Sequence, residues 1–125
     1  MYSTVVDNSP RIRVSTSKHV VDYAVDGSLM NPLEAFYASL AACAAVFAKK
    51  ACKGLGISAA GIEIDCKPFA GPGGPFALAK YRTDVRFPAG FSGEQKAAVL
   101  DAIAQCAVKE VVKDGAAIEF IVAEV

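Results

Sequence analysis

The sequence predicts a single α+β domain over residues 1–125, for three reasons. The chain has 125 residues, which is the length of one ordinary domain. Hydrophobic residues make up 54% and charged residues 21%, a composition that favours a globular fold with a core. Short alternating segments follow one another in pairs, and such hairpins indicate an α+β fold rather than a doubly wound parallel sheet. The expected order is β-β-α-β-β-α-β.

The expected strands are short segments in which apolar or β-branched residues alternate with polar ones. Ile62, Ile64 and Cys66 alternate with charged residues in this way, and Tyr81, Thr83 and Val85 do so further along. A loop rich in Gly and Pro at residues 71–75 separates the members of the second pair, and Asp26-Gly27-Ser28 forms a turn after the first pair. The five segments are residues 11–16, 19–25, 57–68, about 77–87 and 117–125.

A long central helix is expected from Asn31 to about Lys53. Asn31 and Glu34 form an Asn-x-x-Glu capping box around Pro32, which suits the first helical position. Glycine at position 54 marks its end. The helix contains eight alanines and is apolar nearly all round, so we expect it to be buried on most sides.

A second helix is expected from the capping box at Ser92–Gln95 to about Lys113. Ser92 is the capping residue, Gln95 is its partner, and Gly115 supplies the stop. Cys106 falls inside this segment and shares a helical face with Val99 and Ile103.

Composition argues against several functional classes. Lys plus Arg and Asp plus Glu each number 13, so the zero net charge offers no general attraction for nucleic acid or an anionic membrane. The longest uncharged run of the central helix has 14 residues, short of the roughly 18 to 20 that span a bilayer. The N-terminal segment lacks an apolar signal core, which predicts a cytoplasmic protein with reduced thiols.

The cysteines and histidine are not spaced as metal ligands. The four cysteines are Cys43, Cys52, Cys66 and Cys106, and the single histidine is His19. Structural zinc sites have closely paired Cys and His residues, so no metal is expected. The glycine-rich segment at residues 71–75 lacks Gly-Lys-Ser/Thr, so we expect no phosphate cofactor either.

Cys43 and Cys106 each lie on an apolar helical face. Phe36, Leu40 and Phe47 share the face of Cys43 at helical spacing. These faces could meet in the core. Two interpretations therefore stay open for the pair: small buried hydrophobes, which is the common role of a free cysteine, or reactive thiols.

Residues 31–56, NPLEAFYASLAACAAVFAKKACKGLG, resemble the central helix of the OsmC/Ohr family. That family has an Asn-Pro or Ser-Pro start, a glutamate in the first turn, an alanine-rich stretch and Ala-Cys twelve residues after the Asn. Cys43 stands at that distance from Asn31. The family's second cysteine lies some sixty residues on, and here Cys106-Ala107-Val108 follows Cys43 by 63 residues. The element order is similar as well.

This resemblance implies an intertwined homodimer that reduces organic hydroperoxides. The long helices would pack inside the dimer, which agrees with a mean hydropathy of +0.36. Cys43 would be the peroxidatic thiol and Cys106 the resolving thiol. The resemblance also implies a dithiol reductant such as a dihydrolipoyl group.

The chain departs from the family at three positions. The family's activating Arg lies some forty residues before its first cysteine. In this chain, Arg11 or Arg13 could take the place of that residue. The glutamate of the Ohr branch aligns with Leu33, so Glu34 is a candidate catalytic residue one position later, with the capping box as its other role. Ala107 stands where the family usually has proline.

An alternative function remains open from the residues. The protein could be a non-catalytic dimer of the same fold, in which Cys43 and Cys106 line an apolar interface cavity for a small hydrophobic ligand. A cation near Cys43 would favour the enzyme, because a thiol in the middle of a helix gains nothing from the helix N-terminus.

Overall fold

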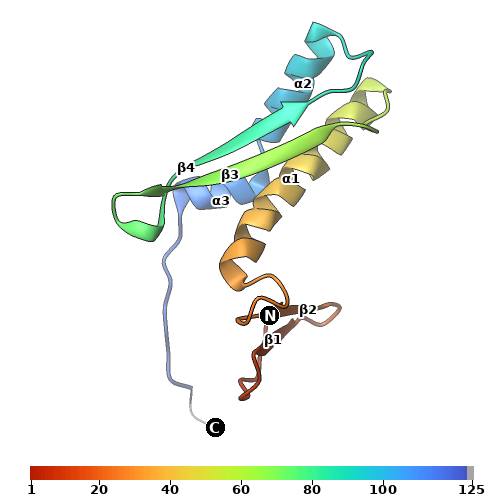
Figure 1. The fold of residues 1–125 in the computed structure, drawn as a ribbon. Helices are drawn as coiled ribbons and strands as arrows, with labels where there is room; N and C mark the ends of the chain where they lie inside the picture. The colour runs from red at the N-terminus through yellow and green to blue at the C-terminus, as the bar shows by residue number, and fades with distance from the viewer. Residues whose placement is uncertain (124–125) are drawn as a thin grey trace. The chain divides into compact units, whose positions relative to one another are not determined.

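The computed structural model describes residues 1–123, apart from the side chains of residues 75, 76 and 107. Its contacts divide the chain into two compact units, Met1–Ser39 and Leu40–Val125. The α+β class is confirmed (Figure 1). The elements are β1 (Arg11–Ser15), β2 (Val20–Ala24), α1 (Pro32–Leu55), β3 (Glu63–Gly71), β4 (Gly74–Arg86), α2 (Gly93–Ala104) and α3 (Ala107–Asp114).

The first unit contains the predicted N-terminal hairpin. β1 and β2 pair antiparallel, with Ile12 opposite Tyr23 and Val14 opposite Val21. Ser3 adds an isolated antiparallel bridge to Ser15 at the edge of β1. The prediction of two short strands at this place is confirmed.

The central helix α1 begins at the predicted capping box. The Asn31 Oδ1 atom accepts a hydrogen bond from the Glu34 backbone N–H at 2.9 Å, and the Asn31 N–H donates to Glu34 Oε1 at 3.4 Å. These bonds satisfy backbone N–H groups that the first helical turn leaves without partners. The helix ends at Leu55, followed by Gly56 with φ of 70°.

One stripe of α1 is buried within the chain, and the opposite stripe is exposed. Leu40, Ala44, Ala48 and Cys52 form the buried stripe at four-residue spacing. Val46, on the other side, is 47% exposed. The expectation that α1 is buried on most sides is therefore not met within one chain, because β3, β4 and the later helices cover only one of its faces.

By length and composition alone, α1 is also able to cross a membrane. The sequence estimate considered only the uncharged run, whereas the whole helix has 24 residues with its lysines near the C-terminal end. The core helix of a globular protein has the same composition, and the stripe that contains Ala44 and Ala48 is packed inside the protein.

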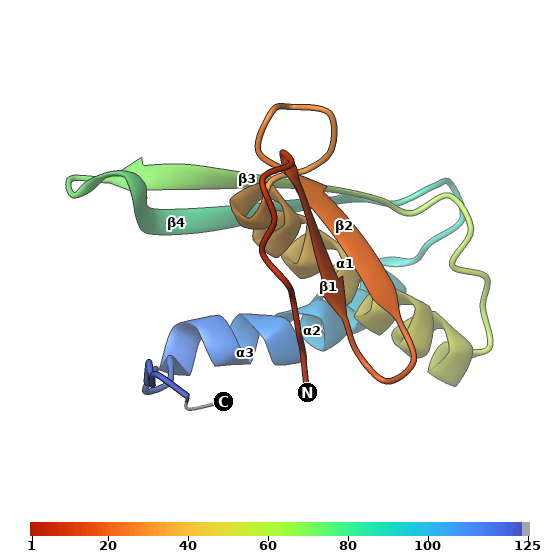
Figure 2. The same cartoon turned by 90° about the horizontal axis from the view of Figure 1, so that it is seen from below.

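The strands β3 and β4 form an antiparallel hairpin in which Ile64 pairs with Val85 and Cys66 with Thr83. β3 begins at Glu63, later than the predicted residue 57, because residues 57–62 first turn back over the end of α1. The Ile57 N–H donates to the Cys52 carbonyl at 3.0 Å in this turn. Figures 1 and 2 show α2, α3 and the second half of α1 on one face of the hairpin.

The core of the second unit is small and tightly packed. Val99 of α2 is fully buried, and it forms a cluster with Ala48 and Cys52 of α1. Half-buried side chains from the turn, the hairpin and α2 surround it, and they include Ile57, Ile62, Ile64, Phe87, Phe91 and Ile103. The opposite face of the hairpin is charged and exposed, with Arg86 paired to Glu63 and Asp65.

The C-terminal part differs from the prediction in two ways. The single helix expected from Ser92 to Lys113 is two helices, α2 and α3, with a break at Gln105 and Cys106. The closing strand expected at residues 117–125 is absent from residues 117–123, and residues 124–125 lie outside the described part. A strand needs a hydrogen-bonded neighbour, and residues 117–123 have none among residues 1–123. Phe120 is 95% exposed.

Gly61 tests how closely the turn before β3 packs against Pro88, which follows β4. Its φ is +93°, and a Cβ added there would lie 3.2 Å from Pro88. We expect Gly61→Ala to lower the free energy of unfolding by about 1–3 kcal/mol, from backbone strain and crowding. Gly27 is the matched control, because its φ is +87° but a Cβ would meet nothing within 4 Å. Urea unfolding that gave equal losses for Gly61→Ala and Gly27→Ala would contradict the contact with Pro88.

Candidate redox site

Cys43 and Cys106 form a disulfide that links α1 to the start of α3. Their Cα atoms are 6.1 Å apart, within the 4.4–6.8 Å range in which a disulfide forms without movement of the backbone. Spacing in the sequence left open whether the two helical faces meet, and the fold brings them together. Both cysteines belong to the second unit.

Cys43 lies at the edge of the buried stripe of α1. It is half-buried and sits between Leu40 and Ala44 on one side and the exposed helical face on the other. Its place in the middle of a 24-residue helix leaves it without free backbone N–H groups to stabilise a thiolate. The helix backbone therefore contributes nothing to the activation of this thiol.

Cys106 occupies a different environment, at the N-cap of α3. Its side chain makes no capping hydrogen bond, and its carbonyl accepts the first helical bond from Glu110 at 3.1 Å. The residue is only 3% exposed. A sulfur at a helix N-terminus lies at the positive end of the helix dipole, which favours the thiolate over the thiol. The break in the helix arises although Ala107 replaces proline.

An open groove of about 670 Å³ lies beside Cys106, between α1, β4, α2 and α3. Its walls are largely apolar. Four of the residues that line it carry polar groups: Tyr81, Thr83, Lys109 and Lys113. The Lys109 Nζ lies 2.6 Å from Glu110 Oε1. The hydrogen bond from Lys109, with the charges of Lys109 and Lys113, lowers the pKa of Glu110.

Glu34, the third candidate catalytic residue, has the capping role that the sequence also allowed. Its backbone N–H and carboxylate both bond to Asn31, as described above. These bonds account for an acidic residue at this position without a catalytic role.

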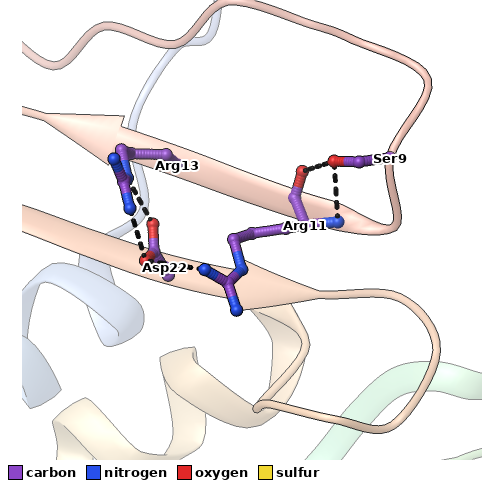
Figure 3. Close-up of polar contacts among 4 residues, drawn as sticks. All are labelled: Ser9, Arg11, Arg13 and Asp22. Carbon is purple, nitrogen blue, oxygen red and sulfur yellow. Dashed lines mark hydrogen bonds and ion pairs between the residues drawn. The ribbon is translucent and has the colours of Figure 1, made fainter.

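Arg11 and Arg13 both interact with Asp22 within the N-terminal hairpin (Figure 3). Arg13 donates from Nε and Nη2 to the two Asp22 oxygens, at 2.8 and 3.1 Å, whereas Arg11 Nη1 lies 3.9 Å from Oδ2. The hydrogen bond between Arg13 and Asp22 lowers the pKa of Asp22 and raises the pKa of Arg13. Both arginine side chains are more than half exposed. Activation of Cys43 by either residue remains a prediction.

The two other cysteines are free thiols. Cys52 is 1% exposed and packs in the core cluster, and the Cys66 Sγ lies 3.6 Å from Thr83 Oγ1 across the hairpin. Among the described residues, no three His, Cys, Asp or Glu side chains gather as a metal site requires.

Sequence analysis missed the groove and its two lysines. Cys106, Lys109 and Lys113 are spaced by three and four residues, which places them on one side of α3. That spacing was visible in the sequence. The sequence predicts one helix through Cys106, whereas the structure begins a new helix there.

The fold and the disulfide define a class: an α+β protein in which a disulfide links α1 to the start of α3, on the helices that cover one face of a β-hairpin. A family model for OsmC-like proteins matches residues 25–120. The match covers more than half of the chain, so the chain belongs to the OsmC-like protein family. No curated protein sequence matches it.

Two solved structures share the fold at low sequence identity. One is a protein from Psychrobacter arcticus 273-4, provisionally described as an osmotic stress induced and detoxification response protein; its TM-score is 0.74 at 12% identity, over 87% of this chain and 85% of that chain. The other is an OsmC-like protein from Mycoplasma pneumoniae, with a TM-score of 0.73 at 13% identity, over 90% of this chain and 86% of that chain. They confirm the OsmC-like fold.

The capping bonds of Glu34 predict which substitutions the position tolerates. Gln preserves the capping box and Ala does not. We expect Glu34→Gln to leave the free energy of unfolding nearly unchanged and Glu34→Ala to lower it by about 0.5–1 kcal/mol, as measured by urea unfolding. If Glu34→Gln instead removed hydroperoxide consumption from a stably folded protein, Glu34 would have a catalytic role.

Proposed function

We propose that the protein reduces organic hydroperoxides through a cycle in which Cys43 and Cys106 alternate between two thiols and a disulfide. The observation that carries the proposal is the disulfide itself, which joins the two cysteines beside an apolar groove. Membership of the OsmC-like family supports a role in osmotic stress or detoxification, and the description of the Psychrobacter arcticus protein agrees with that role.

In the first half of the cycle, the Cys43 thiolate attacks an oxygen of the hydroperoxide. A sulfur–oxygen bond forms, the O–O bond breaks, and the departing alkoxide takes a proton and leaves as the alcohol. Cys43 is then a sulfenic acid, oxidised by two electrons. The Cys106 sulfur attacks Cys43, water leaves with the sulfenic oxygen, and the disulfide forms.

In the second half, a dithiol reductant opens the disulfide. One reductant thiolate forms a mixed disulfide with Cys43 and displaces the Cys106 thiolate, and the second reductant thiol then releases Cys43 as its own disulfide closes. Cys106 suits the role of leaving group because it stands at the N-terminus of α3, where the helix dipole favours a thiolate. A dihydrolipoyl group is the reductant that the family resemblance implies.

The environment of the pair suits an organic peroxide better than hydrogen peroxide. Leu40, Ala44, Leu100 and Ile103 are among the apolar residues that line the groove next to Cys106. An alkyl or aryl group placed against these side chains leaves water, which favours binding.

Cysteine variants test the cycle. We expect Cys43→Ser to abolish consumption of cumene hydroperoxide, and Cys106→Ser to stop turnover while a sulfenic acid accumulates on Cys43. Cys66→Ser is the control, because Cys66 is a free thiol on β3 outside the pair. Stopped-flow oxidation with trapping and mass spectrometry of the modified residue makes the measurement. Full activity of Cys43→Ser would overturn the proposal.

We also propose that the working form is a homodimer built across α1. The support is the exposed stripe of this helix, where Ala42 and Val46 face water in the single chain. Small and apolar side chains allow close helix packing, and such a face is normally covered by a partner.

Light scattering tests the dimer. We expect twice the chain mass of 13.0 kDa at micromolar concentration, and a shift towards the single mass in Val46→Glu, because a carboxylate on α1 would be buried in the interface. Val111→Glu is a matched control at another exposed valine, on α3. A wild-type monomer, or equal effects of the two variants, would contradict an interface on α1.

The apolar groove favours a second candidate function, the binding of a small hydrophobic ligand without catalysis. The relative reactivity of the four cysteines distinguishes the enzyme from the binding protein. For the enzyme, we expect Cys43 of the reduced protein to react with peroxide much faster than Cys52 or Cys66, because rate follows thiolate fraction and access. Equal labelling of all four cysteines by a thiol reagent at neutral pH would favour the binding protein.

A further inference from the structure

The turn end of the β3–β4 hairpin carries a group of cations on the face opposite the helices. Tyr81 lines the groove, and alternation along β4 therefore places its neighbours Lys80 and Arg82 on the other face. Their partners across the hairpin are Phe69 and Lys67. These four side chains form the hairpin-end cluster, and the two-cysteine cycle gives no reason for it.

The two lysines of this cluster have no carboxylate to neutralise them. Arg82 pairs with Asp84 at 2.9 Å, and the two other carboxylates of this face pair with Arg86. Within the described part of the chain, neither Lys67 nor Lys80 has a carboxylate oxygen within 4.0 Å. Their Nζ atoms lie instead 5.3 and 5.7 Å from the centre of the ring between them, as cation–π contacts.

The turn beyond the cluster is uncharged and projects from the protein. Residues 68–79 contain no Asp, Glu, Lys or Arg. Figures 1 and 2 both show this end of the hairpin extending past α3. Phe69 is 37% exposed, and Pro72 and Gly73 in the turn are exposed as well. An uncharged projecting end with cations at its border combines the two attractions that hold proteins in the headgroup layer of a membrane.

We propose that the hairpin end docks on an anionic lipid surface, with Phe69 and the turn at headgroup level and Lys67 and Lys80 against the lipid phosphates. The methylene stem of a lysine lies along apolar surface while its ammonium group reaches the charged layer. The zero net charge of the whole chain offers no general attraction to such a surface. The cluster is a local exception, because its two lysines are unpaired.

The geometry favours a lipid surface over two other partners. Single-stranded nucleic acid binds by stacking its bases on open aromatic faces, whereas two ammonium groups already lie over the Phe69 ring. A symmetric contact with a second copy would bring like charges together. The proposal goes beyond hydroperoxide reduction, because docking needs neither a peroxide nor free thiols.

Sedimentation with vesicles tests the proposal on the full chain in its disulfide form. The probes are vesicles of phosphatidylcholine alone and vesicles that contain about one third phosphatidylglycerol. We expect binding to the anionic vesicles to be about tenfold tighter than binding to the neutral ones. This preference should disappear at about 1 M salt, where the screening length falls to about 3 Å.

Paired lysine variants test the role of the cluster. We expect Lys67→Gln combined with Lys80→Gln to weaken binding to the anionic vesicles about 25-fold, or about fivefold for each cation at the surface. Lys50→Gln combined with Lys53→Gln is the matched control, because it removes the same charge from exposed positions on α1. Lys50 also lies over an aromatic ring, that of Phe47. The control should leave binding nearly unchanged.

A fluorescent side chain locates the contact. The chain contains no Trp, so Phe69→Trp introduces a single reporter, and Trp suits the headgroup layer as well as Phe does. We expect its emission to shift to shorter wavelength when anionic vesicles are added, and brominated lipids to quench it. Val111→Trp is the control at an exposed position on α3 and should keep the emission of a solvated side chain.

Three results would overturn the proposal: equal binding to the two kinds of vesicle, including none to either; equal effects of the two paired lysine variants; or unchanged emission from Phe69→Trp. Tighter binding of oligothymidylate than of anionic vesicles would also overturn it and assign the cluster to nucleic acid. So would a dimer that becomes a monomer in the Lys67 and Lys80 variant, which would assign it to a second copy. A protein that docks on vesicles and consumes no hydroperoxide retains this surface and loses only the catalytic cycle.

Discussion

Small side chains on one stripe of α1 determine how closely the second unit packs. Ala44, Ala48 and Cys52 let the hairpin and α2 approach the helix backbone, and Val99 fills the remaining space with a fully buried side chain. Because packed interiors hold few voids, a larger residue on this stripe would push α2 and α3 away from α1. The 6.1 Å separation of the Cys43 and Cys106 Cα atoms depends on that close approach.

The two cysteines occupy unequal backbone positions, and this inequality gives them different chemistry. Cys43 lies within a continuous helix whose N–H groups are already bonded, whereas Cys106 stands where α2 has ended and α3 begins. The second position lies at the positive end of the α3 dipole, and the first does not. Cys106 at this break and Lys109 and Lys113 of α3 all line the same groove.

The apolar surface left by one chain connects the fold to assembly. The outer stripe of α1 and the segment around Phe120 are exposed in the single chain, and both are too apolar to be explained as ordinary surface. A second copy is the partner that the OsmC-like resemblance implies. The dimer proposed above would also account for the high proportion of hydrophobic residues in so short a chain.

Local patterns in the sequence determined the hairpins, the capping boxes and most of α1, because turns, caps and alternation depend on neighbours a few residues away. The capping role of Glu34 could be predicted from the Asn-x-x-Glu spacing alone. The positions of Cys43 and Cys106 on two apolar helical faces likewise identified them as a candidate pair. Only the tertiary structure decided that Cys43 and Cys106 meet, that the chain turns over residues 57–62 before β3, and that a groove opens beside Cys106. These features depend on how closely elements distant in the chain pack, and that distance is set by the combined volumes of side chains from α1, β4, α2 and α3, which no local pattern contains.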